Sequence, residues 1–201
     1  MIKVLEDLVD ALSTLPAIGK KSAWRLAVHL MERPKDEVAS LADAILRARE
    51  ELTRCKRCFS YSEKEICPVC ESSSRDQRCI CVVEKAIDIF AIEKVGRYRG
   101  VYHVLGGVLS PLNGITADKL KLKELKDRVI LENPGEIIIG FGGSADAETT
   151  ALYIARIFRD IDIKITRLAR GMPAGMELEY VDQLTLSQAL NERTEITYGN
   201  E

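Results

Sequence analysis

The 201-residue sequence predicts an α/β protein built from several small domains, on the strength of three observations. Apolar residues recur at helical spacing over residues 1–53. Two closely spaced pairs of cysteines then interrupt this pattern within residues 54–77. From residue 79, short apolar runs alternate with helical segments, as in a parallel sheet flanked by helices, and a short tail follows from residue 171.

The N-terminal region is expected to contain three helices. Leucines and valines keep a helical period up to Leu15, and the period resumes near Lys20 and again over residues 35–53. Between the first two helices lies Pro16-Ala17-Ile18-Gly19, which contains two strong helix breakers. Trp24, on the second helix, is expected to anchor the core of this hairpin rather than to stack on a base.

The second of these helices begins in a basic environment. No acidic residue occurs over residues 11–31, whereas Lys20, Lys21 and Arg25 cluster there. A glycine before a helix leaves backbone N–H groups free at the positive end of the helix dipole, which can hold a phosphate without reading a base. An ordinary hairpin with solvated lysines is the alternative. The local charge favours contact with the DNA backbone through these three residues.

Four cysteines form two CxxC pairs separated by eight residues: Cys55, Cys58, Cys67 and Cys70. Each pair presents two sulfurs from one tight turn, and four thiolates suit one tetrahedral Zn²⁺ with Zn–S bonds of about 2.3 Å. Redox dithiols or disulfides are the alternative, but a redox CxxC usually occurs singly within a βαβ unit. We therefore predict one structural zinc ion per chain.

Four apolar runs in the C-terminal part predict strands, at residues 79–84, 101–105, 136–141 and 163–169. Helices are predicted between them, including 117–128 and 147–160. A further helix over 184–190 and a last strand over 194–198 are predicted in the tail.

Two features of the first predicted strand and helix concern packing rather than chemistry. Cys79 and Cys81 lie in an apolar run and are expected to be buried, inert thiols. In the helix that follows, Ile87, Phe90 and Ala91 are predicted to face the core.

The overall composition limits the class of protein. With 46% hydrophobic and 30% charged residues, the chain is typical of soluble globular proteins. No stretch is long enough to span a membrane, and the first residues are too acidic for a secretory signal, so a cytoplasmic protein without a membrane partner is expected. A formal net charge of −2 argues against a basic coat over the whole surface.

Residues 15–30 resemble the helix-hairpin-helix segment of the RecR family of bacterial recombination mediators, usually written LPGIGPKSAxRLAxHL. Ala17 stands where the family has its first glycine, and Lys20 where it has proline. The cysteine finger follows at the family's position. Residues 98–115 are similar to the family's YRGxYHVLGGxLSPLxGI, and residues 166–175 resemble its closing segment. The resemblance covers nearly the whole chain in the family's order.

This resemblance implies a Toprim domain, a Rossmann-like fold that places a glutamate after its first strand and two acids after a later one. Glu84, Asp146 and Glu148 match these positions, although Gly142-Gly143-Ser144 replaces the family's Asn-Pro-Thr. Carboxylates gathered at the ends of parallel strands repel one another, and their hard oxygens suit Mg²⁺. Because no nucleophile or further catalytic domain is evident, docking of a basic partner protein is preferred, and Mg²⁺ is not expected to be required.

By the same resemblance, residues 1–53 form a helix-hairpin-helix DNA-binding domain, 54–77 a zinc finger, 78–173 the Toprim domain and 174–201 an oligomerisation tail. The implied protein is a non-catalytic mediator of recombinational DNA repair. It would clamp DNA of any sequence as a homodimer or homotetramer, and act with RecO and RecF to help load recombinase on single-stranded DNA. The alternatives are a Mg²⁺-dependent Toprim nuclease or primase and a zinc-bearing adaptor that meets only proteins.

Overall fold

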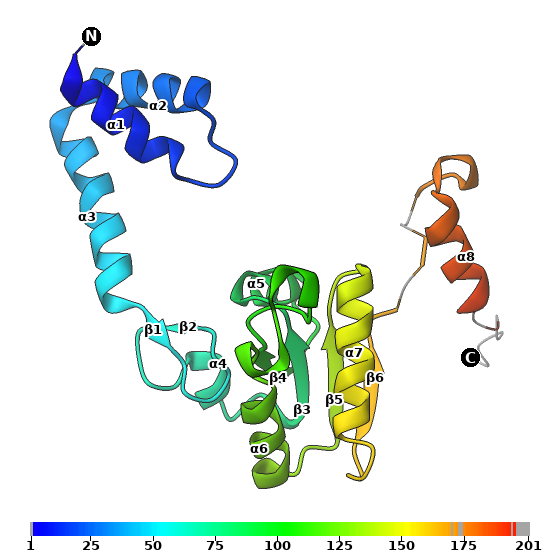
Figure 1. Cartoon of the computed structure of the whole chain (residues 1–201). Helices are drawn as coiled ribbons and strands as arrows, with labels where there is room; N and C mark the ends of the chain where they lie inside the picture. The colour runs from blue at the N-terminus through cyan, green and yellow to red at the C-terminus, as the bar shows by residue number, and fades with distance from the viewer. Residues whose placement is uncertain (1, 170, 173–174, 194, 196–201) are drawn as a thin grey trace, which may run out of the picture. The chain divides into compact units, whose positions relative to one another are not determined.

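The computed structural model describes residues 2–169, 171–172, 175–193 and 195 (Figure 1). The chain separates into two compact units, Met1–Thr53 and Arg54–Glu201. Among the described residues, no helix is both long enough and apolar enough to cross a membrane.

The N-terminal unit consists of three helices, α1 (Lys3–Ser13), α2 (Lys20–Glu32) and α3 (Lys35–Glu51). The two alanines Ala23 and Ala27 let α2 pack closely against Val9 of α1, and these three residues are buried. Larger side chains surround this small core and are partly buried: Leu5, Leu8, Leu12, Ile18 and Trp24. The predicted packing role of Trp24 is thus confirmed.

The turn between α1 and α2 contains a strained residue. Ala17 has φ +64°, a left-handed conformation that glycine adopts without penalty and alanine adopts at a cost. Gly19, by contrast, is extended with φ −80° and forms the N-cap of α2, where its carbonyl accepts the N–H of Ala23 at 2.9 Å.

The second unit begins with a small module built around the cysteines. Its two short strands, β1 (Thr53–Arg54) and β2 (Tyr61–Ser62), pair with each other, and a single helical turn, α4 (Pro68–Glu71), carries the last cysteine. We call residues 54–75 the zinc module.

The larger part of this unit is a four-stranded parallel sheet in the order β4-β3-β5-β6. Val83 pairs with Val104 on one side and with Gly140 on the other, so the carboxyl ends of the three strands meet at one edge. Gly140 is needed there, because a Cβ would lie 2.9 Å from the Cys81 sulfur. The strands are β3 (Asp76–Val83), β4 (Gly100–Val104), β5 (Glu136–Gly140) and β6 (Lys164–Arg167).

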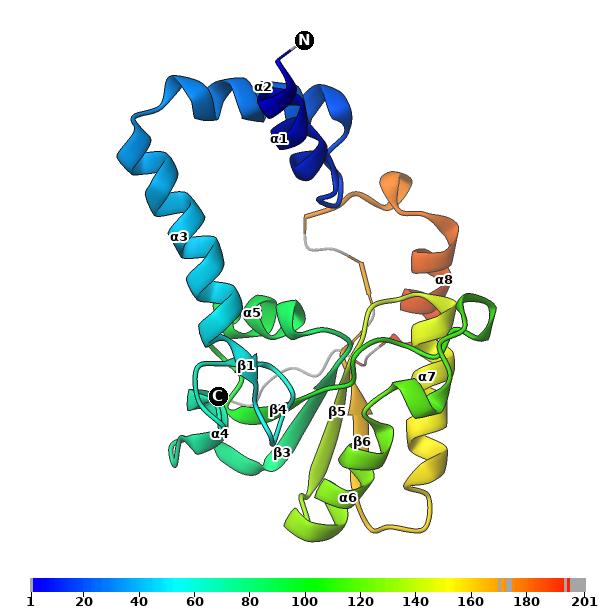
Figure 2. The ribbon, with the colours of Figure 1, turned by 60° about the vertical axis from the view of Figure 1, so that its left-hand side comes forward.

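The alternating side chains of β3 divide the core between the two faces of the sheet. Ile80 and Val82 enter one cluster with residues of α6 (Leu122–Glu132) and α7 (Ala145–Ile157). Cys81 and Val83 enter the other cluster, which includes residues of α5 (Ala86–Val95). Figures 1 and 2 show the helices flanking the sheet. The predicted parallel, helix-flanked sheet is therefore confirmed.

Two sequence predictions about the helices are wrong. Ile87 and Phe90 are 65% and 61% exposed, whereas Ala86 and Ile89 form the buried face of α5. The apolar residues of this helix are spread around it rather than gathered on one face, so the hydrophobic period could not select the inward face. The helix predicted from residue 117 begins at Leu122, after a short 3₁₀ turn over Ala117–Lys119.

The tail contains the predicted helix as α8 (Gln183–Asn191), which begins after Asp182, whose carboxylate accepts the N–H of Thr185 at 2.9 Å. The predicted strand over 194–198 lies outside the described residues, apart from Glu195. Several large apolar side chains of the tail are exposed: Leu178, Tyr180, Leu184 and Leu190.

Candidate functional site

The four predicted zinc ligands come together in the zinc module. Their sulfurs all lie within 4.8 Å of one another, and all four residues are buried. The Sγ atoms of Cys58 and Cys67 are 3.6 Å apart, close to the edge of about 3.8 Å of a tetrahedron with Zn–S bonds of about 2.3 Å. The first knuckle is closed by the N–H of Phe59 donating to the Cys55 carbonyl at 2.9 Å, and Cys67 N–H donates to the Cys55 sulfur. The donor set and spacing fit zinc.

The pKa values of these cysteines also favour a bound divalent cation. Hydrogen bonding by the Cys58 and Cys70 side chains lowers the pKa of Cys67, while hydrogen bonding to Cys58 and Cys67, together with burial, raises the pKa of Cys70. Without a cation, Cys58, Cys67 and Cys70 therefore do not all become thiolates together in this buried place. A divalent ion removes this repulsion and binds all four sulfurs as thiolates.

A partly buried ion pair ties the zinc module to α6. The Nε and Nη2 atoms of Arg57 donate to the two carboxylate oxygens of Glu132 on α6, both at 2.8 Å, and Nη1 donates to the carbonyl of Cys70 at 2.9 Å. Burial works to raise the pKa of Glu132, but hydrogen bonds from Arg57 and the charge of Arg128 outweigh it and lower that pKa. The module is thus fixed to the domain that follows it.

A buried histidine lies beneath the module. Nε2–H of His103 donates to the carbonyl of Lys121 at 2.9 Å, and its ring meets that of Phe59 edge to face with centroids 5.3 Å apart. Nδ1 has no hydrogen-bond partner among the described residues. Burial lowers the pKa of His103 to about 4, so the ring is neutral at pH 7. It packs the core and is not placed as a metal ligand.

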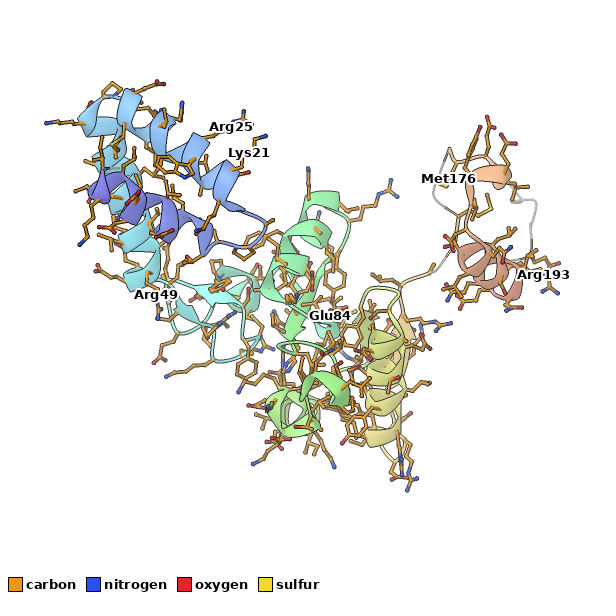
Figure 3. The ribbon with its side chains drawn as sticks, turned by 45° about the horizontal axis from the view of Figure 1, so that its top comes forward. Lys21, Arg25, Arg49, Glu84, Met176 and Arg193 are labelled. Atoms are coloured by element: carbon orange, nitrogen blue, oxygen red, sulfur yellow. The ribbon has the colours of Figure 1, made fainter. Side chains whose placement is uncertain are left out.

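The predicted DNA-binding residues lie at the start of α2. Lys20 and Lys21 are its first two residues, and Arg25 lies one turn after Lys21 on the same side of the helix (Figure 3). All three side chains are exposed, and the first turn contains no acid. The first N–H groups of a helix have no partner within it, so this end offers both backbone donors and cations to an anion.

Glu84 stands at the carboxyl edge of the sheet, directly after β3 (Figure 3). Its Oε1 accepts the N–H of Gly142, 3.3 Å away, in the loop that follows β5. This bond joins the two neighbouring strands at their ends, so the glutamate organises the loop in which the sequence departs from the family pattern.

Asp146 and Glu148 lie in the first turn of α7, where carboxylates stabilise the helix dipole. Ser144 caps the same turn by accepting the N–H of Ala147 at 3.1 Å. Glu148 forms an ion pair with Arg167, with 3.1 Å between Oε1 and Nη1, and Arg167 also contacts Glu192.

The three carboxylates share one edge of the sheet but not one metal site. Among the described residues, the cysteines are the only group of three or more His, Cys, Asp or Glu whose ligand atoms all lie within 4.8 Å of one another. Sequence reasoning missed Arg57 and Glu132, which hold the zinc module to α6, and Arg167, which pairs with Glu148 at the acidic edge. Arg57 could have been noticed, because it stands inside the first CxxC pair, but its partner is 75 residues away.

The remaining cysteines, Cys79 and Cys81, fit the expected inert role. Burial raises the pKa of Cys79 and raises that of Cys81 to about 12, which disfavours reactive thiolates. Cys81 is buried as predicted, whereas Cys79 is half-buried and lies 3.8 Å from the Tyr98 hydroxyl.

Protein-family models match consecutive parts of the chain. The RecR helix-hairpin-helix model matches residues 5–49, and the RecR zinc finger model, whose zinc is held by four cysteines, matches 52–72. The Toprim domain model matches 78–169, and the RecR C-terminal model matches 171–194.

Relatives named "Recombination protein RecR" are similar over almost the full length. The protein of Deinococcus radiodurans is 46% identical over 193 residues, covering 96% of this chain and 87% of the relative. That of Dehalococcoides mccartyi is 45% identical over 190 residues, covering 94% and 93%. That of Cytophaga hutchinsonii is 45% identical over 193 residues, covering 96% and 94%.

A helical hairpin, a four-cysteine module and a parallel sheet edged with acids together define a multidomain Toprim protein with a structural zinc site. The similarity over the whole chain narrows this class further. The chain belongs to the RecR family of recombination proteins, and its four-cysteine finger with Cys55, Cys58, Cys67 and Cys70 clustered together supports one structural zinc ion.

Proposed function

We propose that this chain is a non-catalytic mediator of recombinational DNA repair, in the RecF pathway and in the cytoplasm. As a homodimer or homotetramer it clamps DNA without reading its sequence, and it acts with RecO and RecF to help load recombinase onto single-stranded DNA. The observation that carries the proposal is the cationic, acid-free start of α2. The name of the relatives, "Recombination protein RecR", supports it.

The start of α2 can bind DNA through phosphate alone. Backbone N–H groups after Gly19 would hold one phosphate, and Lys21 and Arg25 would contact its neighbours along the strand. Because these contacts reach no base edge, binding would be independent of sequence and sensitive to salt.

Replacing Lys21 and Arg25 together by alanine tests this contact. Affinity for DNA should fall alike for all sequences, and the log–log salt slope should become shallower by roughly one unit per lost phosphate contact. Fluorescence anisotropy at several salt concentrations measures both quantities. A variant with Lys35→Ala and Arg49→Ala, which removes the same charge from exposed positions of α3, is the matched control. Unchanged affinity and slope in the first variant would exclude this contact.

Self-association is supported by apolar side chains that the chain leaves exposed in both units. Leu41, Ile45 and Leu46 are exposed on α3, and Leu184 and Leu190 on α8. Such surfaces on a folded protein commonly mark association sites. The mass in solution, measured by light scattering with and without DNA, should be two or four times that of the chain. A monomer under both conditions would contradict the clamp.

The acidic edge of the sheet is proposed as the docking site for RecO rather than as a catalytic site. Glu84→Gln with Asp146→Asn removes two charges while leaving Glu84 an oxygen to accept the Gly142 N–H. This variant should weaken RecO binding in a salt-sensitive manner, with zinc content, DNA affinity and mass unchanged. If the wild-type chain cuts or extends DNA with Mg²⁺ and the variant does not, the nuclease or primase alternative replaces the docking role.

A further inference from the structure

A pocket of about 440 Å³ opens between the zinc module and the start of α5. Its lining combines three cations with aromatic and aliphatic side chains, and none of the described residues that line it is acidic. Nothing in the DNA contact at α2 or the acidic edge uses it. The residues that matter most are Arg54, Phe59 and Tyr61 of the zinc module, Lys85 and Ile87 at the start of α5, and Lys121.

The cations of this pocket are placed on or beside its rings. The guanidinium of Arg54 lies 4.1 Å from the centroid of the Tyr61 ring, and Nζ of Lys121 lies 5.2 Å from that of Phe59. Tyr61 is nevertheless 51% exposed. Arg54 lies over one face of this ring, and the exposed part that remains is a flat surface of the kind on which a nucleic-acid base stacks.

Positive charge remains available there. Lys121 is partly neutralised by Glu124, with 2.7 Å between Nζ and Oε1, whereas Lys85 has no carboxylate within ion-pair distance among the described residues. The nearby carboxylate of Asp88 accepts the backbone N–H of Lys85 at 2.7 Å and closes the start of α5. Lys85, which lines the pocket, is therefore available to meet a phosphate there.

We propose that this pocket binds one nucleotide of single-stranded DNA, with its base on Tyr61 and its phosphate between Lys85 and Arg54. The volume falls within the range of roughly 300–1,000 Å³ usual for small-ligand sites. A duplex cannot use the pocket in this way, because its bases are already paired and stacked. The inference rests on the proposed DNA-binding function and assigns to it a preference for unpaired strands, through a second site distinct from the backbone contact at α2.

The test compares a fluorescently labelled thymidine oligonucleotide with a duplex of equal length, by anisotropy. Tyr61→Ala should weaken binding of the single strand roughly tenfold or more, as expected for loss of one stacked base, and leave duplex affinity unchanged. Tyr61→Phe should retain binding, because the ring remains. Lys85→Glu should also weaken binding of the single strand and leave duplex binding unchanged. Lys126→Glu, the same change at an exposed position of α6 outside the pocket, should leave both unchanged. Zinc content and melting temperature check that each variant is folded.

Equal affinity of wild type, Tyr61→Ala and Lys85→Glu for the single strand would overturn the proposal, and so would an equal loss for the duplex. A labelled peptide of aspartates around one phenylalanine serves as a competing probe. If it binds the wild type but not Lys85→Glu, and the oligonucleotide binds both alike, the pocket takes a protein segment instead. Failure of the proposed DNA-binding function appears differently, as a wild-type chain that binds neither form of DNA.

Discussion

The two units of this chain differ in what holds each of them together. In Arg54–Glu201, apolar clusters fill both faces of the sheet, and four thiolates and the Arg57–Glu132 ion pair fix the zinc module beside it. Among the described residues of Met1–Thr53, the buried core is limited to one valine and two alanines, and α3 has no buried residue.

The difference shows which surfaces the chain leaves open to contacts with other molecules. The exposed Leu41, Ile45 and Leu46 on α3 remain available to a partner, because the helical unit does not need them for its own core. The sheet unit is instead a cross-linked frame that can hold a pocket and an acidic edge in constant positions.

Removal of one zinc ligand should have the largest effect. Cys58→Ser should lose the ion and unfold the zinc module, because binding of a structural zinc contributes on the order of 10 kcal/mol that so small a module cannot replace. Elemental analysis and near-ultraviolet circular dichroism measure this. Cys79→Ser, at a cysteine outside the zinc module, should retain one zinc per chain. Native-purified wild type without zinc would contradict the assignment.

Acid should destabilise the sheet unit through His103. Since burial lowers its folded pKa to about 4, the unfolded chain binds more protons between that pH and the ordinary value of about 6.5. The contribution of the neutral ring to the free energy of unfolding is at its maximum above pH 6.5. It declines by about 1.4 kcal/mol per pH unit as the pH falls toward 4. Denaturant titrations from pH 7.5 to about pH 5 should give a shallower pH dependence for His103→Gln than for wild type. Parallel curves would contradict this role.

Breaking the Arg57–Glu132 pair should loosen the zinc module without removing the metal. Arg57→Ala leaves Glu132 partly buried with less compensation, at a cost of about 2 kcal/mol, less than for a fully buried pair because both side chains are about a fifth exposed. The free energy of unfolding and the zinc content should be measured together. Arg159→Ala, which removes an exposed ion pair with Asp160, should cost almost nothing. Equal effects of the two variants would refute the bracing role of Arg57.

Relief of strain in the hairpin should have the smallest effect. Ala17→Gly should stabilise the helical unit by up to about 1 kcal/mol, because glycine adopts the observed φ of +64° without a Cβ penalty. Thermal unfolding measures the change. Ala11→Gly, within α1, should instead destabilise the helical unit by about 1 kcal/mol, because there glycine only increases the conformational entropy of the unfolded chain. A lower melting temperature for Ala17→Gly would show that the turn is not strained.

Much of the fold was accessible to sequence reasoning because its signals are local. Cysteine spacing identifies the zinc ligands, and the acid-free window before and within α2 is visible in the sequence itself. Prediction failed on α5, where seven of the ten residues are apolar. The inward face of α5 is the one that packs against Cys81 and Val83 of the sheet. The spacing of apolar residues within the helix does not identify that face.

By itself, the sequence determined which chemical groups occur together along the chain: four thiolates in two turns, cations at the start of one helix, and an acid at the end of a strand. Only the tertiary structure decided which distant groups meet, such as Arg57 with Glu132, Glu84 with the Gly142 N–H, and Tyr61 with Lys85 around one pocket. The physical reason is the separation along the chain of the residues that interact. Helical periods, caps and metal knuckles are set by residues a few positions apart, whereas ion pairs and pockets depend on how sheet and helices pack.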